Sequence, residues 1–160
     1  MELLDLIDCD GNSLGRTIAR GDKSFGEGEY IKLVVVYLKS HDKYLLQLTS
    51  EEKGREYAVT GGHVPTGVTT KEQAIIECEE ELGIKLNIRN LEYLGNYPMG
   101  HGIFYVYKYE DDNLENIKMI LQEEEVEKVE WLTKEQIQKL IDDKLVRPST
   151  CKSFKMFIKD

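Results

Sequence analysis

The chain has 160 residues, a formal net charge of -9 at pH 7, 41% hydrophobic residues and 32% charged residues. One hydrophobic core can bury most of the apolar surface at this size, so a single domain over residues 1–160 is expected. Sequence-independent binding to nucleic acid or to an anionic membrane requires a basic protein surface, so the negative net charge argues against both.

The first third of the chain predicts strands separated by turns. Glu2–Cys9 is a short, partly apolar run that ends at Asp10-Gly11-Asn12, which is typical of a strand followed by a tight turn. A polar, glycine-containing stretch then extends to about Glu29. Ile31–Leu38 and Lys43–Leu48 are rich in β-branched and aromatic residues, and they predict a hairpin of core strands.

A short strand, a glycine pair and a helix follow. Tyr57–Thr60 has strand character and continues directly into Gly61-Gly62, where the chain can turn sharply or approach a ligand closely. Thr69-Thr70 begins a capping-box pattern, so a helix is predicted from there to Leu82. Gly83 is the residue type that ends a helix.

The remaining elements complete a mixed α/β pattern. Glu92–Tyr97 and Gly102–Tyr109 predict two strands, and Val126–Leu132 predicts another. Thr133 caps a helix to about Asp142, and Ser153–Ile158 predicts a last helical turn or two. The sheet is therefore expected to be mixed and substantial.

The helix after the glycine pair carries a group of acids. At about 100° per residue, its apolar side chains fall on one side. A neighbouring stripe holds Gln73, Glu77, Glu80 and Glu81. Such close carboxylates repel one another unless a hard cation such as Mg²⁺ or Mn²⁺ compensates them. The alternative is a solvated acidic helix face, because acidic runs on surface helices are common.

Together with the glycine pair, these acids resemble the Nudix box, G-x5-E-x7-R-E-U-x-E-E-x-G-U, over residues 62–84. The matching positions are Gly62, Glu77, Glu80, Glu81, Gly83 and Ile84, with Cys78 as the aliphatic residue U. The resemblance implies a Nudix fold, which is an α/β/α sandwich with a mixed sheet between helices.

The resemblance also implies functional residues. Glu77, Glu80 and Glu81 would be the catalytic acids and metal ligands for Mg²⁺ or Mn²⁺, with the Gly62 carbonyl and Glu125 as further ligands. Gly61, Gly62 and His63 would contact the substrate, although a histidine in a loop is as often a packing residue. The expected reaction is hydrolysis of a diphosphate linkage in a nucleoside diphosphate derivative.

Two positions depart from the box and bear on activity. Val68 replaces its first glutamate and Ile76 replaces its arginine, so a charged pair becomes an apolar pair, which a fold can tolerate. Glu77 thereby loses the partner that orients it in the family, and a weak or atypical hydrolase is expected. The alternatives are a catalytically reduced Nudix-fold module that binds nucleotide or metal, and a plain structural domain.

Residues 4–22 resemble the start of bacterial Nudix proteins related to isopentenyl-diphosphate isomerase. Isomerase activity is disfavoured, because those enzymes use a reactive cysteine near Thr60-Gly61-Gly62-His63 and this chain has none there. The three cysteines, Cys9, Cys78 and Cys151, form no disulfide or zinc pattern. The acidic first residues and the lack of a long apolar run favour a cytoplasmic protein. The expected partner is a small-molecule diphosphate, and a homodimer is left open.

Overall fold

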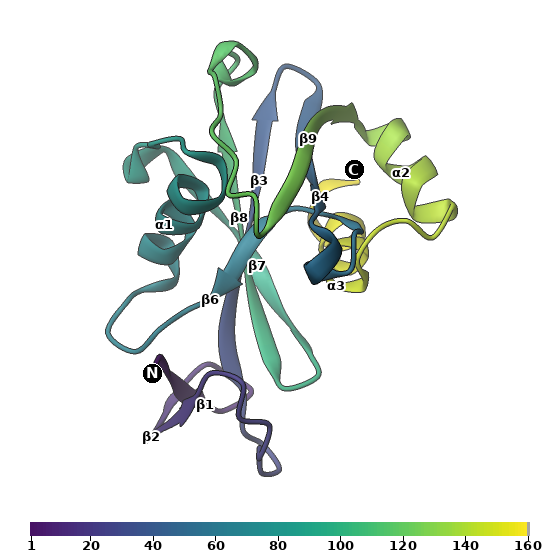
Figure 1. The fold of residues 1–160 in the computed structure, drawn as a ribbon. Helices are drawn as coiled ribbons and strands as arrows, with labels where there is room; N and C mark the ends of the chain where they lie inside the picture. Colours follow the sequence, from purple (N-terminus) through teal and green to yellow (C-terminus); the bar gives the residue numbers. More distant parts are fainter. Residues whose placement is uncertain (160) are drawn as a thin grey trace.

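In the computed structural model, which describes residues 1–159, a mixed sheet lies between helices (Figure 1). Helix α1 (Thr70–Leu82) covers one face, and α2 (Lys134–Asp142) and α3 (Pro148–Ser153) lie on the other side. The strands are β1 (Leu3–Ile7), β2 (Ser13–Ala19), β3 (Ile31–Ser40), β4 (Lys43–Thr49), β5 (Tyr57–Ala58), β6 (Thr60–His63), β7 (Leu91–Met99), β8 (Gly102–Glu110) and β9 (Val126–Thr133). The expected α/β/α arrangement is confirmed.

Strand β3 is the centre of the sheet, and it diverges from its hairpin partner. It pairs with β8 in parallel and with β6 antiparallel. Its pairing with β4 is confined to the turn, at Lys39–Tyr44 and Ser40–Lys43, after which β4 pairs with β9 and β5 instead. The predicted hairpin is therefore correct at its turn. Away from the turn, β3 and β4 are not paired with each other.

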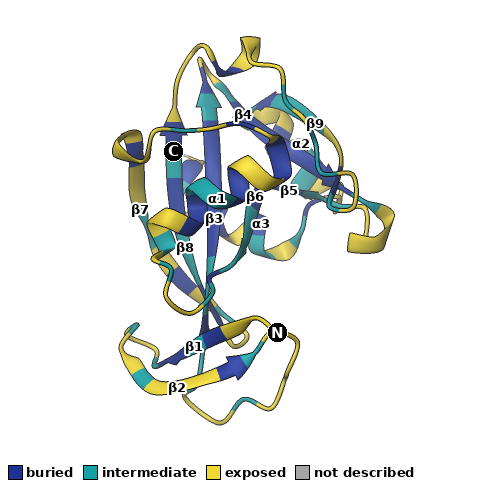
Figure 2. Cartoon of the chain, turned by 60° about the vertical axis from the view of Figure 1, so that its left-hand side comes forward, coloured by how far each residue is buried: buried dark blue, intermediate teal, exposed yellow. Residues whose placement is uncertain are grey.

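The two faces of β3 build two separate cores. Val34, Val36 and Leu38 pack under α1, whereas Val35 and Tyr37 pack on the side of α2 and α3. This alternation follows from the two-residue period of a strand and explains why β3 is apolar from Leu33 to Leu38 without a break. Figure 2 shows the buried residues running along β3 and the inner side of α1, with exposed residues on the outer side of the helix.

The structure adds a strand and extends the last helix. Ser13–Ala19, expected to be part of an irregular stretch, is β2 and pairs with β1 in a small separate sheet. Most of its side chains are exposed, so it lacks the apolar alternation that would have predicted it. The last helical segment begins at Pro148, a residue favoured in the first turn of a helix. No helix in residues 1–159 is both long and apolar enough to cross a membrane.

Candidate active site

The glycine pair brings β6 against two neighbours at once. A Cβ on Gly61 would lie 2.2 Å from the Val34 carbonyl oxygen, so β6 can pair this closely with β3 only without a side chain there. A Cβ on Gly62 would lie 2.4 Å from Glu77 Oε1. Gly62 thus leaves room for the Glu77 carboxylate beside the strand, and its place in the sequence pattern has a steric cause.

Helix α1 is fixed in position by its ends. Thr69 and Glu72 form the reciprocal capping box expected from the sequence, with each side chain bonding to the backbone of the other residue. Gly83 ends the helix in the left-handed conformation at φ 67°. The predicted helix is confirmed, and it holds its inner side against β6 and β3.

Two carboxylates of α1 are buried together against β6. Glu77 is 9% exposed and Glu81 is 6% exposed. Gln73 Nε2 donates to Glu77 Oε1 at 2.7 Å, and Gln47 Nε2 donates to Glu81 Oε1 at 3.2 Å. The hydroxyl of Thr60 in turn donates to Gln47 Oε1 at 3.2 Å. The two acids are therefore held by uncharged amides, and these bonds bring no positive charge to them.

Burial changes the proton affinity of both acids. It raises the pKa of Glu77 to about 7, where the charge of Glu80 adds to the effect and the Gln73 hydrogen bond opposes it. Burial also raises the pKa of Glu81 to about 8, and the charges of Glu77 and Glu125 add to that shift. Two neighbouring buried acids that resist ionisation would be stabilised in their charged form by a cation bound between them.

The third acid of the box lies elsewhere. Glu80 is exposed, and no group of three His, Cys, Asp or Glu side chains within residues 1–159 is arranged to hold a metal. Of the three acids, Glu77 and Glu81 are buried together, and Glu80 lies apart from them on the exposed side of the helix. Residues four apart on a helix differ by only about 40° around the axis, so Glu77 and Glu81 face β6 together, and the packing of α1 against β6 leaves Glu80 on the solvent side.

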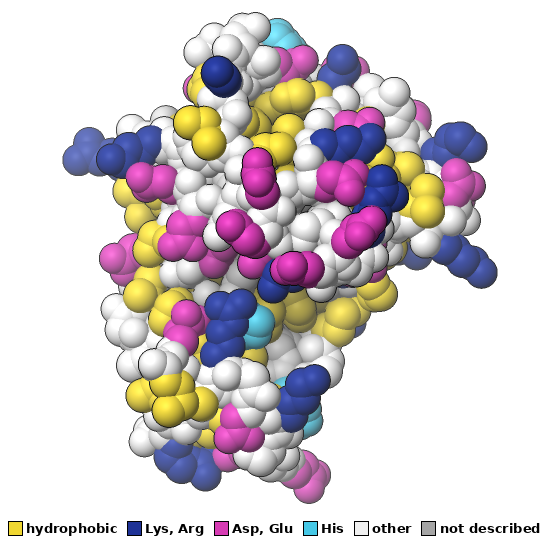
Figure 3. All heavy atoms as spheres, viewed as in Figure 1, with side chains coloured by type: hydrophobic (Ala, Val, Ile, Leu, Met, Phe, Trp, Pro, Cys, Tyr) yellow, Lys and Arg dark blue, Asp and Glu magenta, His cyan; other side chains and the backbone are white. Residues whose placement is uncertain are grey.

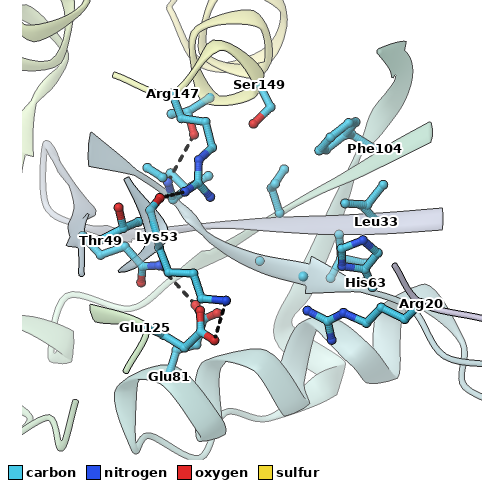
Figure 4. A pocket seen from close by; sticks show the side chains of 18 residues that line it. Arg20, Leu33, Thr49, Lys53, His63, Glu81, Phe104, Glu125, Arg147 and Ser149 are labelled. Carbon is cyan, nitrogen blue, oxygen red and sulfur yellow. Dashed lines mark hydrogen bonds and ion pairs between the residues drawn. The ribbon is translucent and has the colours of Figure 1, made fainter. Parts of the chain in front are cut away.

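A cavity of 220 Å³ opens beside the buried pair, where β3 and β4 separate (Figure 4). Gly61, Gly62, His63 and Glu81 all line it, which places the expected substrate contacts on one wall. Its other lining residues come from segments far apart in the sequence: Arg20, Leu33, Val34, Val35, Gln47, Thr49, Lys53, Ala58, Val59, Phe104, Glu125, Arg147, Ser149 and Thr150.

Three basic side chains that line this cavity were not predicted from the sequence: Arg20, Lys53 and Arg147. Arg147 Nε pairs with Glu56 Oε1 at 2.7 Å, and its Nη2 donates to the Lys53 carbonyl at 3.2 Å. Arg20 is nearly half exposed, and its charge still acts on Glu77 and on His63. Figure 3 shows acidic side chains gathered across the middle of this face with basic ones directly beside them. Arg20, Lys53 and Arg147 lie on separate segments of the chain, so no local pattern could have grouped them.

Glu125 and His63 occupy opposite sides of the cavity. Glu125 lies beside Glu81 and pairs with Lys53, whose Nζ is 3.4 Å from Glu125 Oε1 (Figure 4). His63 is partly buried, and burial together with the charge of Arg20 lowers its pKa. Its ring is therefore favoured in the neutral form, which can accept or donate a hydrogen bond to a ligand.

The residues that depart from the box, and its cysteine, have structural roles. Val68 is partly buried and packs against the core under α1, as an apolar substitute for a glutamate can. Ile76 is also partly buried. Cys78 is completely buried in the same core, and burial raises the pKa of its thiol, so it packs as a small apolar residue as expected.

The donor set fits a hard divalent cation. Carboxylate oxygens are the ligands that Mg²⁺ prefers, and Mg²⁺ keeps several waters, so two protein carboxylates are a sufficient anchor. A divalent ion would also compensate the negative charge that burial disfavours on both acids. Glu77 and Glu81 are the side chains that would hold it, with Gly62 beside Glu77.

Comparisons with known proteins identify a family from the sequence and similar folds among solved structures. The model of the NUDIX domain matches residues 31–151. The crystal structure of DR0079 from Deinococcus radiodurans matches with a TM-score of 0.82 and 20% identity, covering 98% of this chain and 99% of that one. A MutT NUDIX hydrolase from Burkholderia pseudomallei matches with a TM-score of 0.64 and 15% identity, covering 78% and 95% of the two chains. No curated protein matches the chain.

A larger enzyme contains a similar domain. It is a bifunctional NMN adenylyltransferase/ADP ribose pyrophosphatase from Francisella tularensis, complexed with AMP and a manganese ion. The TM-score is 0.64 at 17% identity, with 79% of this chain and 40% of that chain covered. At these identities the structural matches support the fold, and the family rests on the domain model.

Proposed function

This chain belongs to the Nudix family, and we propose that it hydrolyses a diphosphate linkage in a small-molecule substrate with the help of Mg²⁺ or Mn²⁺. The observation that carries the proposal is the buried pair Glu77 and Glu81. Glu77 lies against Gly62, and Glu81 lines a cavity that also contains three basic side chains. Buried acids without a cationic partner are costly, and metal binding gives them a function.

The chain's own residues supply binding and proton transfer. Arg20, Lys53 and Arg147 are placed to attract the anionic substrate into a cavity of an otherwise acidic protein. Glu77, which lies against Gly62 at the proposed metal site, would accept a proton from the attacking water. A bound divalent ion supplies charge neutralisation on the phosphoryl oxygens and a more acidic water.

The substrate class we propose is a nucleoside diphosphate linked to another group. The cavity combines basic side chains with the apolar surfaces of Leu33 and Phe104, so it offers contacts for phosphates and for a less polar substituent. The structurally similar Francisella enzyme is described as an ADP ribose pyrophosphatase as well as an adenylyltransferase, and the first of these activities acts on a compound of this class.

The second candidate is a binding module with reduced turnover, and Ile76 favours it. In the resemblance, an arginine at this position orients the catalytic glutamate, whereas here Glu77 is held by the neutral Gln73. A hydrogen bond from an amide restrains the carboxylate but does not balance its charge. Both candidates require the metal, and they differ only in turnover.

Product release separates the two. Phosphate and nucleotide products are measured from a panel of nucleoside diphosphate derivatives with Mg²⁺, for the wild type, Glu77→Gln and Glu81→Gln. The matched control is Glu79→Gln, because Glu79 is exposed on the same helix. We expect both buried variants to lose at least about a hundredfold in kcat/KM while the control keeps its rate. Equal release by all four proteins would contradict hydrolysis at this site.

A further inference from the structure

We propose that a second cavity next to the active site binds a planar aromatic ring of the substrate, such as a nucleobase. The cavity measures 300 Å³ and is lined by Lys23, Phe25, Ile31, Leu33, Met99, His101, Gly102 and Phe104. This inference rests on the proposed function, because it assigns the part of a diphosphate substrate that does not react.

The two cavities share a wall. Leu33 and Phe104 line both of them, and they are direct neighbours on the parallel strands β3 and β8. Gly102 leaves room for Leu33 at this wall, since a Cβ on it would lie 2.6 Å from Leu33 Cδ1. In Figure 4, Leu33 and Phe104 lie on the same side of the active-site cavity as His63 and Arg20. A substrate held by Arg20 can therefore extend past this apolar wall into the second cavity.

Aromatic rings give the second cavity its character. The rings of Phe25 and His101 stack with centroids 4.7 Å apart and planes inclined by 7°. Phe104 stacks in the same way on Tyr97, with centroids 5.3 Å apart. The stacked rings of the cavity wall are already ordered, so they lose little freedom when another flat ring packs beside them. A flexible aliphatic substituent would lose more freedom on binding than a flat ring does. The lining thus favours an aromatic substituent.

The position of His101 is fixed by the backbone. Its carbonyl accepts from the Ile31 N–H at 2.8 Å, and its Nδ1 lies 2.9 Å from the Glu29 carbonyl oxygen. A carbonyl oxygen can only accept, so Nδ1 carries the proton and, in the neutral ring, Nε2 is an acceptor. An amino group on a heteroaromatic ring, as in adenine or cytosine, can donate to that atom.

Part of the wall of this cavity comes from a segment outside the family match. Arg20, Lys23 and Phe25 precede residue 31, where the match to the NUDIX domain begins. The same segment thus supplies a basic side chain to the active-site cavity and an aromatic ring to the second cavity. We infer that residues 20–25 select the substrate, while α1 and the glycine pair carry the reaction.

Equilibrium binding of adenosine monophosphate, without divalent metal, tests this inference apart from hydrolysis. Calorimetry gives Kd for the wild type and Phe25→Ala, and heteronuclear NMR shows which resonances move. We expect Phe25→Ala to weaken binding by roughly tenfold, as loss of one stacking ring does. Phe25→Tyr should restore it, and the shifts should be concentrated at Phe25 and His101. Tyr93→Ala is the matched control, since it removes an aromatic ring that is 49% exposed and lines neither cavity.

A second ligand distinguishes an aromatic from an aliphatic substituent. Comparing binding with hydrolysis then separates the proposal for the second cavity from the proposed reaction. Adenosine monophosphate should bind at least about tenfold more tightly than isopentenyl monophosphate. Equal binding of the two ligands, or an unchanged Kd in Phe25→Ala with the protein still folded by circular dichroism, would overturn the second cavity as an aromatic site. Ring-dependent binding without any diphosphate hydrolysis would support the second cavity and contradict only the proposed reaction.

Discussion

Raising the pH in the absence of divalent metal should destabilise this protein through Glu77 and Glu81. Each acid holds its proton more tightly in the folded state than in the unfolded chain, because burial raises its pKa from 4.5. Below about pH 4.5 both acids are protonated in the folded and in the unfolded state, so they do not lower the free energy of unfolding. Stability is lost as the pH rises through the folded pKa values of about 7 and about 8.

The size of the loss follows from the pKa shift of Glu77. One pKa unit corresponds to about 1.4 kcal/mol, so a shift from 4.5 to about 7 represents about 3 kcal/mol of unfolding free energy. The shift of Glu81 is not simply added, because the two acids titrate as a coupled pair. At this chain length about 3 kcal/mol corresponds to a fall in Tm of about 6–12 °C.

Thermal unfolding followed by circular dichroism in EDTA, between pH 5 and pH 9, measures this loss. The double variant Glu77→Gln/Glu81→Gln is the reference, because every other titrating group, including His63, is common to both proteins. We expect the Tm of the wild type to fall relative to the variant as the pH rises, and Mn²⁺ to reverse the fall at pH 9. Parallel Tm curves for the two proteins would refute the electrostatic account of the buried pair.

Three variants test neighbouring parts of the site. Gly62→Ala should lower kcat/KM by about a hundredfold and Tm by several degrees, because its Cβ would meet Glu77 Oε1 at 2.4 Å; an unchanged rate would contradict the close approach. Cys78→Ala should retain its rate and lose about 1 kcal/mol in a denaturant titration, whereas loss of turnover in a folded variant would indicate a chemical role. Ile76→Arg combined with Val68→Glu should raise kcat in the product-release assay, and an unchanged kcat would show that the native apolar pair does not limit turnover.

The local parts of the site could be predicted from the sequence. The capping box at Thr69, the end at Gly83 and the acids between them depend on residues close together in the chain, and they define α1 and its phase. The steric reason for Gly62 also lies in this segment, since its nearest neighbour is Glu77. These features are set by hydrogen bonding and helical periodicity, which act over a few residues.

The rest of the site depends on tertiary contacts. Helical geometry places Glu77, Glu80 and Glu81 on one stripe, and only the packing of α1 against β6 decides that Glu80 faces solvent. Arg20 and Arg147 reach the same cavity from loops more than a hundred residues apart in the chain. No sequence period relates such positions, and the separation of β3 from β4 that opens the cavity is likewise a property of the whole sheet.

A crystal structure of the protein soaked in Mn²⁺, with anomalous scattering recorded at the manganese edge, tests the central claim most directly. The account predicts one anomalous peak between the carboxylates of Glu77 and Glu81, next to Gly62, with both side chains in direct contact with the ion. A map without such a peak, in which the two acids keep only their hydrogen bonds to Gln73 and Gln47, would contradict it.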